Sequence, residues 1–196
     1  TSATERAVRN FQSRHGLSVT GYVDLTTWKT MGYSEYDWYN LGTYRTPMKV
    51  TYTSNRQDRI NAMIQTAIDY KNAGTGYKVG CSGTPGSYVD CSGLIYQCLY
   101  AAGINPSSNI VDHALAIHEY TSVNLAADDR LGRSVDSNSL QRGDLVFYGK
   151  NGRNSVAHVA IYAGNGMIYD SWPGRGVTYR SVNIGGYHIV RARRVF

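Results

Sequence analysis

Residues 155–172 constrain the fold more than any other stretch of this chain. They read Ser-Val-Ala-His-Val-Ala-Ile-Tyr-Ala-Gly-Asn-Gly-Met-Ile-Tyr-Asp-Ser-Trp, two alternating runs around Gly-Asn-Gly. Alternation of this kind about a glycine-rich turn predicts a β-hairpin, and therefore an antiparallel sheet. With residues 164–166 as the loop, Ala163 faces Met167 and the register of the whole hairpin follows.

That register gives the hairpin an apolar face and a more polar face. The apolar face, which we expect in the core, carries Val159, Ile161, Ala163, Met167, Tyr169 and Ser171. The other face carries His158, Ala160, Tyr162, Ile168, Asp170 and Trp172. His158 and Asp170 become diagonal neighbours, and a carboxylate there fixes the tautomer of an imidazole. A strand-end role for Asp170 is an equal alternative.

Residues 90–103 predict a buried helix that begins at a cysteine. Its apolar stripe is Cys91, Leu94, Ile95, Cys98, Leu99 and Ala102. Asp90 fits the N-cap and Gly103 ends the helix. Cys91 then lies in the first turn, where backbone N–H groups and the helix dipole favour a thiolate. The simpler alternative, a cysteine that only fills space, is kept for Cys98.

The rest of the chain predicts helices around that sheet. Residues 55–72 carry a helical apolar stripe, and residues 4–31 predict two short helices, the first capped by Thr4 and stopped at Gly16. Residues 33–54 are Tyr-rich without a clean period, as in a linker or packed connector. The prediction is an α+β fold, with helices packed on a central antiparallel sheet and a small helical segment before it.

A nucleophilic cysteine needs a base, and the chain has five histidines. His158 is favoured because Asp170 is its predicted neighbour. The others are His15 in the N-terminal piece, His113 and His118 on a helix-like run over 111–120, and His188 near the C-terminus. The chain has neither His-Glu-x-x-His nor Cys-x-x-Cys, so we expect no metal and no cofactor. Cys81, in a glycine-rich loop, is either free or bridged.

Composition narrows the partners. The longest apolar runs are a few residues, as over 159–163, so we expect no membrane span. The net charge is +6, but its only dense cluster is Arg191, Arg193 and Arg194. These arginines alternate within a strand pattern and accompany no nucleic-acid motif, so we expect no nucleic-acid partner. The chain shows no charged-then-apolar leader, so a mature or trimmed form is expected.

Several blocks occur in a recognisable order. Tyr77 and Gly80 precede Asp-Cys-Ser-Gly-Leu at 90–94. Three blocks follow: Gly-Asp-Leu-Val-Phe-Tyr at 143–148, Ala-His-Val-Ala-Ile-Tyr at 157–162 and Gly-Asn-Gly at 164–166. The set resembles the NlpC-type cell-wall cysteine peptidases of the papain-like superfamily, over roughly 55–196. Residues 4–31 resemble the second half of a small helical peptidoglycan-binding module. We therefore expect a partial binding module over 1–32, a linker over 33–54 and a peptidase domain over 55–196.

The resemblance implies a papain-like fold with the nucleophile at a helix N-terminus, and a reaction. Such enzymes cleave the stem peptides of bacterial peptidoglycan, usually between γ-linked D-glutamate and a diamino acid. Carried over, Cys91 is the nucleophile and His158 the general base. Asp170 takes the third polar position, which is commonly histidine. The remaining carried-over positions are the pocket tyrosine Tyr77 and the substrate-amine contacts Asp90 and Ser92.

Alternatives remain at this point. The chain could instead be an amidase or acyltransferase on another amide, or a non-catalytic wall-binding module. The resemblance implies a secreted or cell-wall-associated protein, or a phage lysin. The cleaved bond, the source and the oligomeric state stay open.

Overall fold

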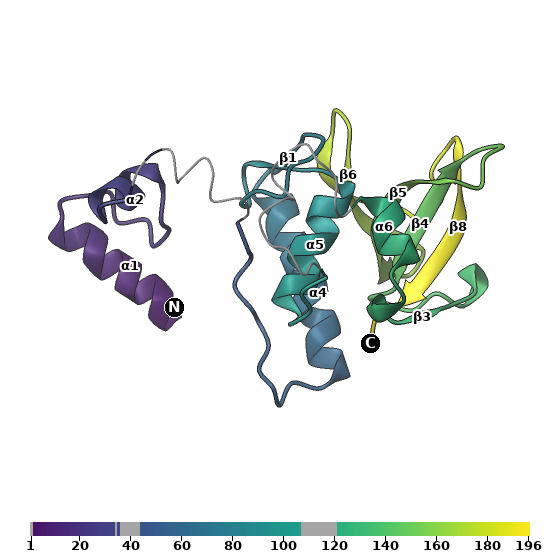
Figure 1. The fold of residues 1–196 in the computed structure, drawn as a ribbon, viewed down its shortest axis with the longest axis horizontal. Coiled ribbons are helices and arrows are strands. Elements are labelled where there is room, and N and C mark those ends of the chain that lie inside the picture. The colour runs from purple at the N-terminus through teal and green to yellow at the C-terminus, as the bar shows by residue number, and fades with distance from the viewer. Residues whose placement is uncertain (1, 34, 36–43, 107–120) are drawn as a thin grey trace. The chain divides into compact units, whose positions relative to one another are not determined.

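The computed structural model describes residues 2–33, 35, 44–106 and 121–196 (Figure 1). Contacts divide the chain into two compact units, Thr1–Gly42 and Thr43–Phe196. The predicted helical run over 111–120, with His113 and His118, lies outside the described residues.

The first unit has two short helices, α1 (Ala3–Arg14) and α2 (Leu25–Thr30). The prediction that Thr4 caps α1 is wrong: the hydroxyl of Ser2 accepts the hydrogen bond from the backbone N–H of Glu5, and Thr4 lies inside the helix. Asp24 caps α2, and its carboxylate accepts from the backbone N–H of Thr27.

A buried glutamine joins the two helices of this unit. The side-chain amide of Gln12 donates to the hydroxyls of Thr20 and Thr27 and to the carbonyl of Tyr22. Its oxygen accepts from the backbone N–H of Gly21, 2.9 Å away. Two helices this short bury little apolar surface, so the hydrogen bonds of one polar side chain hold the turn between them.

The second unit is an α+β domain, as predicted. Its helices are α4 (Arg56–Asn72), α5 (Cys91–Ala101) and α6 (Ser122–Ala127), with 3₁₀ turns η1 (Asp129–Leu131) and η2 (Ser137–Ser139). The main sheet has the strand order β3-β8-β4-β5-β6-β7, and its strands pair antiparallel. The strands are β3 (Arg133–Ser134), β4 (Leu145–Lys150), β5 (Val156–Gly164), β6 (Met167–Trp172), β7 (Gly176–Ser181) and β8 (Tyr187–Arg194). A two-stranded parallel sheet pairs β1 (Gly76–Tyr77) with β2 (Tyr88–Val89).

Apolar side chains fill both faces of the main sheet. Helices α4 and α5 lie side by side against one face (Figure 1), where Leu94, Leu99, Val159 and Ile161 join the larger core cluster. The hairpin face expected to be polar also packs, because Ala160 and Ile168 join a smaller cluster. His158 and Asp170 are buried on this second face rather than lying on an open surface.

The hairpin confirms the predicted register but not the predicted loop. Ile161 pairs with Tyr169 and Tyr162 with Ile168, as expected. The ladder then shifts so that Gly164, and not Ala163, faces Met167. The turn is therefore only Asn165-Gly166, with φ of 53° and 71°. Positive φ at both positions matches the twist of a tight hairpin, and asparagine and glycine tolerate it.

Residues 44–54 of the Tyr-rich segment belong to the second unit and contact its helix α5. The side-chain oxygen of Gln97, on α5, accepts from the backbone N–H of Thr46 at 2.7 Å. The amide nitrogen of Gln97 donates to the carbonyl of Ser82 at 2.8 Å. One buried side chain thus ties this segment and the loop before β2 to the same helix. No described helix has both the length and the apolar character that crossing a membrane requires.

Candidate active site

The site is built around the first turn of α5. Asp90 is its N-cap, and one carboxylate oxygen accepts from the backbone N–H of Gly93 (2.7 Å) and the hydroxyl of Ser92 (2.9 Å). The other oxygen accepts from the backbone N–H of Gly80, 2.7 Å away. Both oxygens are therefore engaged within the chain. The predicted contact of Asp90 and Ser92 with a substrate amine stays a prediction.

Gly93 allows the loop before the helix to lie against the helix backbone. A Cβ atom at this position would lie 2.1 Å from the carbonyl oxygen of Cys81. That carbonyl accepts from the backbone N–H of Asp90 at 2.8 Å. The Asp-Cys-Ser-Gly block thus combines a cap, a thiol, a hydroxyl that supports the cap, and a residue without a side chain.

The start of α5 is also tied to β6. The hydroxyl of Ser171 donates to the carbonyl of Val89, 2.9 Å away. Because Ser171 follows Asp170 and Val89 precedes Asp90, this bond links the strand of the carboxylate to the helix of the thiol. This hydrogen bond therefore holds the start of α5, with Cys91, against β6, with Asp170.

The sulfur of Cys91 lies at the backbone of β5. It accepts hydrogen bonds from the backbone N–H groups of Val159 and Ser92, which lower its pKa. Burial of the sulfur and the Asp90 carboxylate outweigh them and raise the pKa of the Cys91 thiol above its ordinary value. The donors at the helix start act on this pKa in the expected direction, but they are outweighed. The cause is desolvation, which a sequence pattern does not reveal.

His158 and Asp170 come together as the hairpin register predicts. Nε2 of His158 lies 2.7 Å from Oδ2 of Asp170, and both side chains are buried. Burial raises the pKa of Asp170, but hydrogen bonds from His158, Arg180 and Thr178 outweigh it and hold that pKa below its usual value. An ionised carboxylate only accepts, so Nε2 carries a proton. This tautomer leaves a lone pair on Nδ1 of His158. His158 directly precedes Val159, whose backbone N–H contacts the Cys91 sulfur.

Two partners of Asp170 escaped the sequence reasoning. Thr178 and Arg180 both lie on β7, where Thr178 pairs directly with Asp170. The Thr178 hydroxyl donates to Oδ1, and the Arg180 guanidinium donates to both carboxylate oxygens. A signal was available, since Gly-Val-Thr-Tyr-Arg-Ser at 176–181 alternates after a Pro-Gly-Arg turn. Pairing it with β6 would have placed both residues beside Asp170.

An aromatic layer covers the imidazole. The indole of Trp172 meets the ring of His158 edge to face at 4.9 Å between centroids, and the ring of Tyr148 lies at 5.9 Å. Tyr187 packs on the other side of Trp172 at 5.3 Å. Surrounded in this way, the imidazole has little freedom to rotate.

Tyr77, the predicted pocket tyrosine, approaches the thiol from β1. Burial, the Cys91 sulfur and the Asp90 carboxylate raise the pKa of Tyr77 to about 12. The phenol therefore stays protonated and remains a hydrogen-bond donor near the sulfur. Tyr187 contributes to the same shift, so β1 and β8 bring phenols toward one region.

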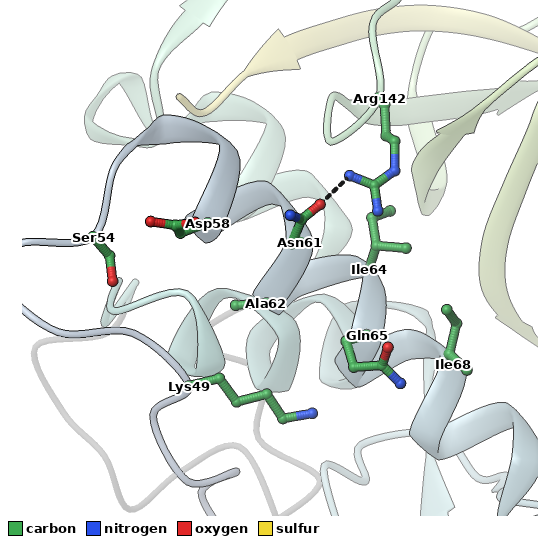
Figure 2. Close-up of a pocket in the computed structure, with 9 residues that line it drawn as sticks. All are labelled: Lys49, Ser54, Asp58, Asn61, Ala62, Ile64, Gln65, Ile68 and Arg142. Atoms are coloured by element: carbon green, nitrogen blue, oxygen red, sulfur yellow. Dashed lines mark hydrogen bonds between the residues drawn. The ribbon is translucent and has the colours of Figure 1, made fainter.

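Two further features of the described residues concern metal binding and a separate cavity. Within the described residues, no cluster of three His, Cys, Asp or Glu side chains is placed to hold a metal ion. A separate pocket of about 570 Å³ lies on α4 (Figure 2). It is lined by Lys49, Ser54, Asp58, Asn61, Ala62, Ile64, Gln65, Ile68 and Arg142, without a cysteine or a histidine. It therefore offers no nucleophile and base for acyl transfer.

The basic cluster at the end of the chain is engaged within the chain. Arg191 and Arg193 both donate to the carbonyl of Ala126, and Arg193 is buried. Arg194 forms a two-point contact with Asp144. These arginines hold β8 to its neighbours.

Fold and site define an α+β domain with a cysteine at a helix start and a histidine–carboxylate pair on the adjoining strands. The NlpC/P60 family model matches residues 74–194, and the chain belongs to the NlpC/P60 family. A second model, of a peptidoglycan binding domain, matches residues 1–31.

Two curated relatives are informative. The chain is 32% identical over 108 residues to the gamma-D-glutamyl-L-lysine dipeptidyl-peptidase of Bacillus cereus, covering 54% of this chain and 28% of that protein. It is 32% identical over 129 residues to the murein DD-endopeptidase MepH of Escherichia coli, covering 62% of this chain and 41% of that one. The chain thus spans less than half the length of either relative.

Solved structures share the fold. NlpC2 from Trichomonas vaginalis matches with a TM-score of 0.54 at 22% identity, covering 74% of this chain and 48% of that one. A mutant of the Resuscitation Promoting Factor Interacting protein RipA matches with a TM-score of 0.51 at 22% identity, covering 98% and 81%.

Proposed function

We propose that this chain is a thiol endopeptidase that cleaves the stem peptides of bacterial peptidoglycan at the bond between γ-linked D-glutamate and a diamino acid. The observation that carries the proposal is the Cys91 sulfur at the backbone of Val159 on β5, the residue that follows His158, whose imidazole is oriented by Asp170. The named activity of the Bacillus cereus relative supports the choice of bond. The binding-domain match over 1–31 supports the choice of polymer, and action outside the cell or at its wall follows from both.

The proposed reaction is acyl transfer. The Cys91 thiol passes its proton to Nδ1 of His158 as the sulfur attacks the peptide carbonyl and the C–S bond forms. The Cys91 backbone N–H at the start of α5, with the Tyr77 phenol as a second donor, stabilises the oxyanion. The proton on the imidazolium then moves to the leaving amine, and the C–N bond breaks. Water, deprotonated by His158, hydrolyses the thioester and restores the thiol.

Asp170 has a role of its own in this scheme. Its ionised carboxylate accepts from Nε2–H, so it fixes the tautomer that presents Nδ1 and stabilises the imidazolium. A carboxylate is chemically adequate for this role, in place of the histidine common in the family.

A second candidate reaction acts on another bond of the same polymer. MepH is named a murein DD-endopeptidase, a name that indicates a bond between two D-configured residues. Digestion of purified muropeptides followed by mass spectrometry separates the two. Our proposal predicts a new free amine on the diamino acid of monomeric stems, with no product from Cys91→Ala. Cross-linked dimers converted only to intact monomers would assign the DD activity, and released lactyl-sugar an amidase. No product from the folded wild-type protein would leave a wall-binding role.

A further inference from the structure

Arg180 contacts each of the two groups that hold the imidazole of His158. Its guanidinium donates through Nε to both oxygens of Asp170, at 3.2 and 3.1 Å, and through a second nitrogen to Oδ2. The same guanidinium stacks over the indole of Trp172, with its central carbon 4.1 Å from the ring centroid. Asp170 and Trp172 are in turn the hydrogen-bond partner and the edge-to-face neighbour of His158.

We propose that Arg180 is a positioning residue for the nucleophile's base: by fixing both Asp170 and Trp172, and by sharing the Asp170 charge, it sets the orientation and the electrostatic balance of the His158–Cys91 pair. This inference rests on the proposed function for its kinetic consequences, but its electrostatic part concerns the free protein and is tested separately. Arg180 acts through its neighbours and is not placed against the substrate.

The strand register makes this contact specific. On β7, Arg180 pairs with Ile168, so it is the diagonal neighbour of Asp170 on the same face. Thr178, directly opposite Asp170, fills the remaining space at Oδ1. The carboxylate is fully buried, whereas the Arg180 side chain is 21% exposed. A buried carboxylate with the imidazole as its only partner would be costly, because a poorly paired charge loses its hydration.

Sharing the charge has a consequence at the sulfur. The Asp170 carboxylate raises the pKa of Cys91, in addition to burial and Asp90. Arg180 partly neutralises that carboxylate, so without Arg180 more negative charge acts on the thiol and the imidazole. The ionised form of Cys91 would then appear at higher pH.

The titratable and charged groups around the pair come from six neighbouring elements. They are Arg180 on β7, Tyr148 on β4, Asp170 on β6, Tyr187 on β8, Tyr77 on β1, and Asp90 and Cys91 at the start of α5. Among these groups Arg180 is the only one with a fixed positive charge, so its removal changes the local balance in one direction.

The test measures how fast iodoacetamide alkylates Cys91 as a function of pH, with mass spectrometry separating Cys91 from Cys81 and Cys98. For Arg180→Met we expect the profile to move to higher pH by about one unit. Arg180→Lys keeps the positive charge but not the planar guanidinium, so its profile should lie close to that of the wild type. Arg194→Met removes an arginine from a similar buried carboxylate and should leave the profile in place. If Arg180→Met does not fold, Arg180→Gln carries the same expectation.

Kinetics on a purified γ-D-glutamyl muropeptide supply the second readout. Arg180→Met should lower kcat by about 10- to 100-fold with KM changed less than about twofold, because a misplaced base slows the chemistry and not the binding. An alkylation profile of folded Arg180→Met that superimposes on the wild type would overturn the inference. If the profile shifts but the wild-type protein cleaves no muropeptide, the proposed function fails and the electrostatic role of Arg180 stands.

Discussion

Asp144 and Asp170 are two buried carboxylates, each held by an arginine of the same sheet, yet they serve different ends. Arg194 reaches Asp144 through Nε at 2.9 Å and a second nitrogen at 2.8 Å, and Asp144 also accepts from the backbone N–H of Gln141. These hydrogen bonds of Asp144 connect one part of the scaffold to another. Asp170 has the imidazole of His158 as a partner besides its arginine, and His158 directly precedes Val159, whose backbone N–H contacts the sulfur of Cys91.

A buried ion pair thus acquires a functional role when a third group joins it, as the His158 imidazole joins Asp170 and Arg180. Both arginines satisfy a charge that would be costly to bury alone. Only the pair at Asp170 lies where that charge acts on a base and a thiol. Variants at matched positions of the two pairs therefore separate stability from chemistry.

The largest contrast is expected from removing each carboxylate. Asp170→Ala should reduce kcat by about a thousandfold or more, because His158 loses its tautomer partner and the imidazolium its counter-charge. Asp144→Ala should cost about 3–5 kcal/mol of unfolding free energy, since Arg194 is left unpaired, with kcat per folded molecule unchanged. Muropeptide kinetics and urea unfolding measure the two. Equal kcat losses in both variants would contradict the division of roles.

Two glycines extend the comparison to the backbone, one at the start of the thiol helix α5 and one against Arg194 on β8. A Cβ at Gly93 would lie 2.1 Å from the Cys81 carbonyl oxygen, and one at Gly132 would lie 2.0 Å from the Arg194 carbonyl oxygen. Gly93→Ala and Gly132→Ala should each lose about 1–3 kcal/mol of stability. Only Gly93→Ala displaces the cap of the thiol helix, so it alone should lower kcat of the folded protein, by about a hundredfold. Undiminished kcat in Gly93→Ala would show that the loop is unimportant for the site.

The Asp170 pair also predicts a pH dependence of stability. The folded-state pKa of Asp170 lies below the usual value of 3.8, because His158, Arg180 and Thr178 outweigh burial. Such a group stabilises the fold above its unfolded pKa, and the contribution is lost as pH falls toward the folded pKa. Arg180→Met raises the pKa of Asp170, so the acid unfolding midpoint should move up by about half a pH unit. Circular dichroism as a function of pH measures this midpoint. An unchanged midpoint in Arg180→Met would show that the Asp170–Arg180 ion pair does not stabilise the fold.

A third buried carboxylate gives the smallest effect. The Asp90 carboxylate raises the pKa of the Cys91 thiol, second only to burial. Asp90→Asn keeps a capping side chain without the charge, so Cys91 should be alkylated at lower pH, by about half a unit. Asp58→Asn, at the capping box of α4, is the matched control and should not move the profile. A shift to higher pH in Asp90→Asn would contradict the sign assigned to this charge.

The sequence predicted the elements whose signals are local. The hairpin register followed from alternation, and the helix over 91–101 followed from its stripe, with Asp90 as the cap. The contact between His158 and Asp170 needed only these local patterns. The cap of α1 failed because serine and threonine two positions apart both fit the pattern, and only the backbone decides between them.

What escaped prediction depends on packing between distant segments. Arg180 and Thr178 reach Asp170 only after β7 has paired with β6. The raised pKa of the Cys91 thiol depends on burial in the folded domain, which outweighs the helix-start donors. The second apolar cluster likewise includes Ile184, which lies outside the alternating pattern of residues 155–172. The predicted boundaries at residues 32 and 54 stay predictions.

The most direct test of the account is to trap the acyl-enzyme. Wild-type protein mixed with a γ-D-glutamyl muropeptide and quenched in acid should carry a thioester on the peptide that contains Cys91. His158→Ala should form almost none, and Cys91→Ala none. Release of the diamino-acid product by Cys91→Ala at the wild-type rate would contradict the assignment of the sulfur as the nucleophile.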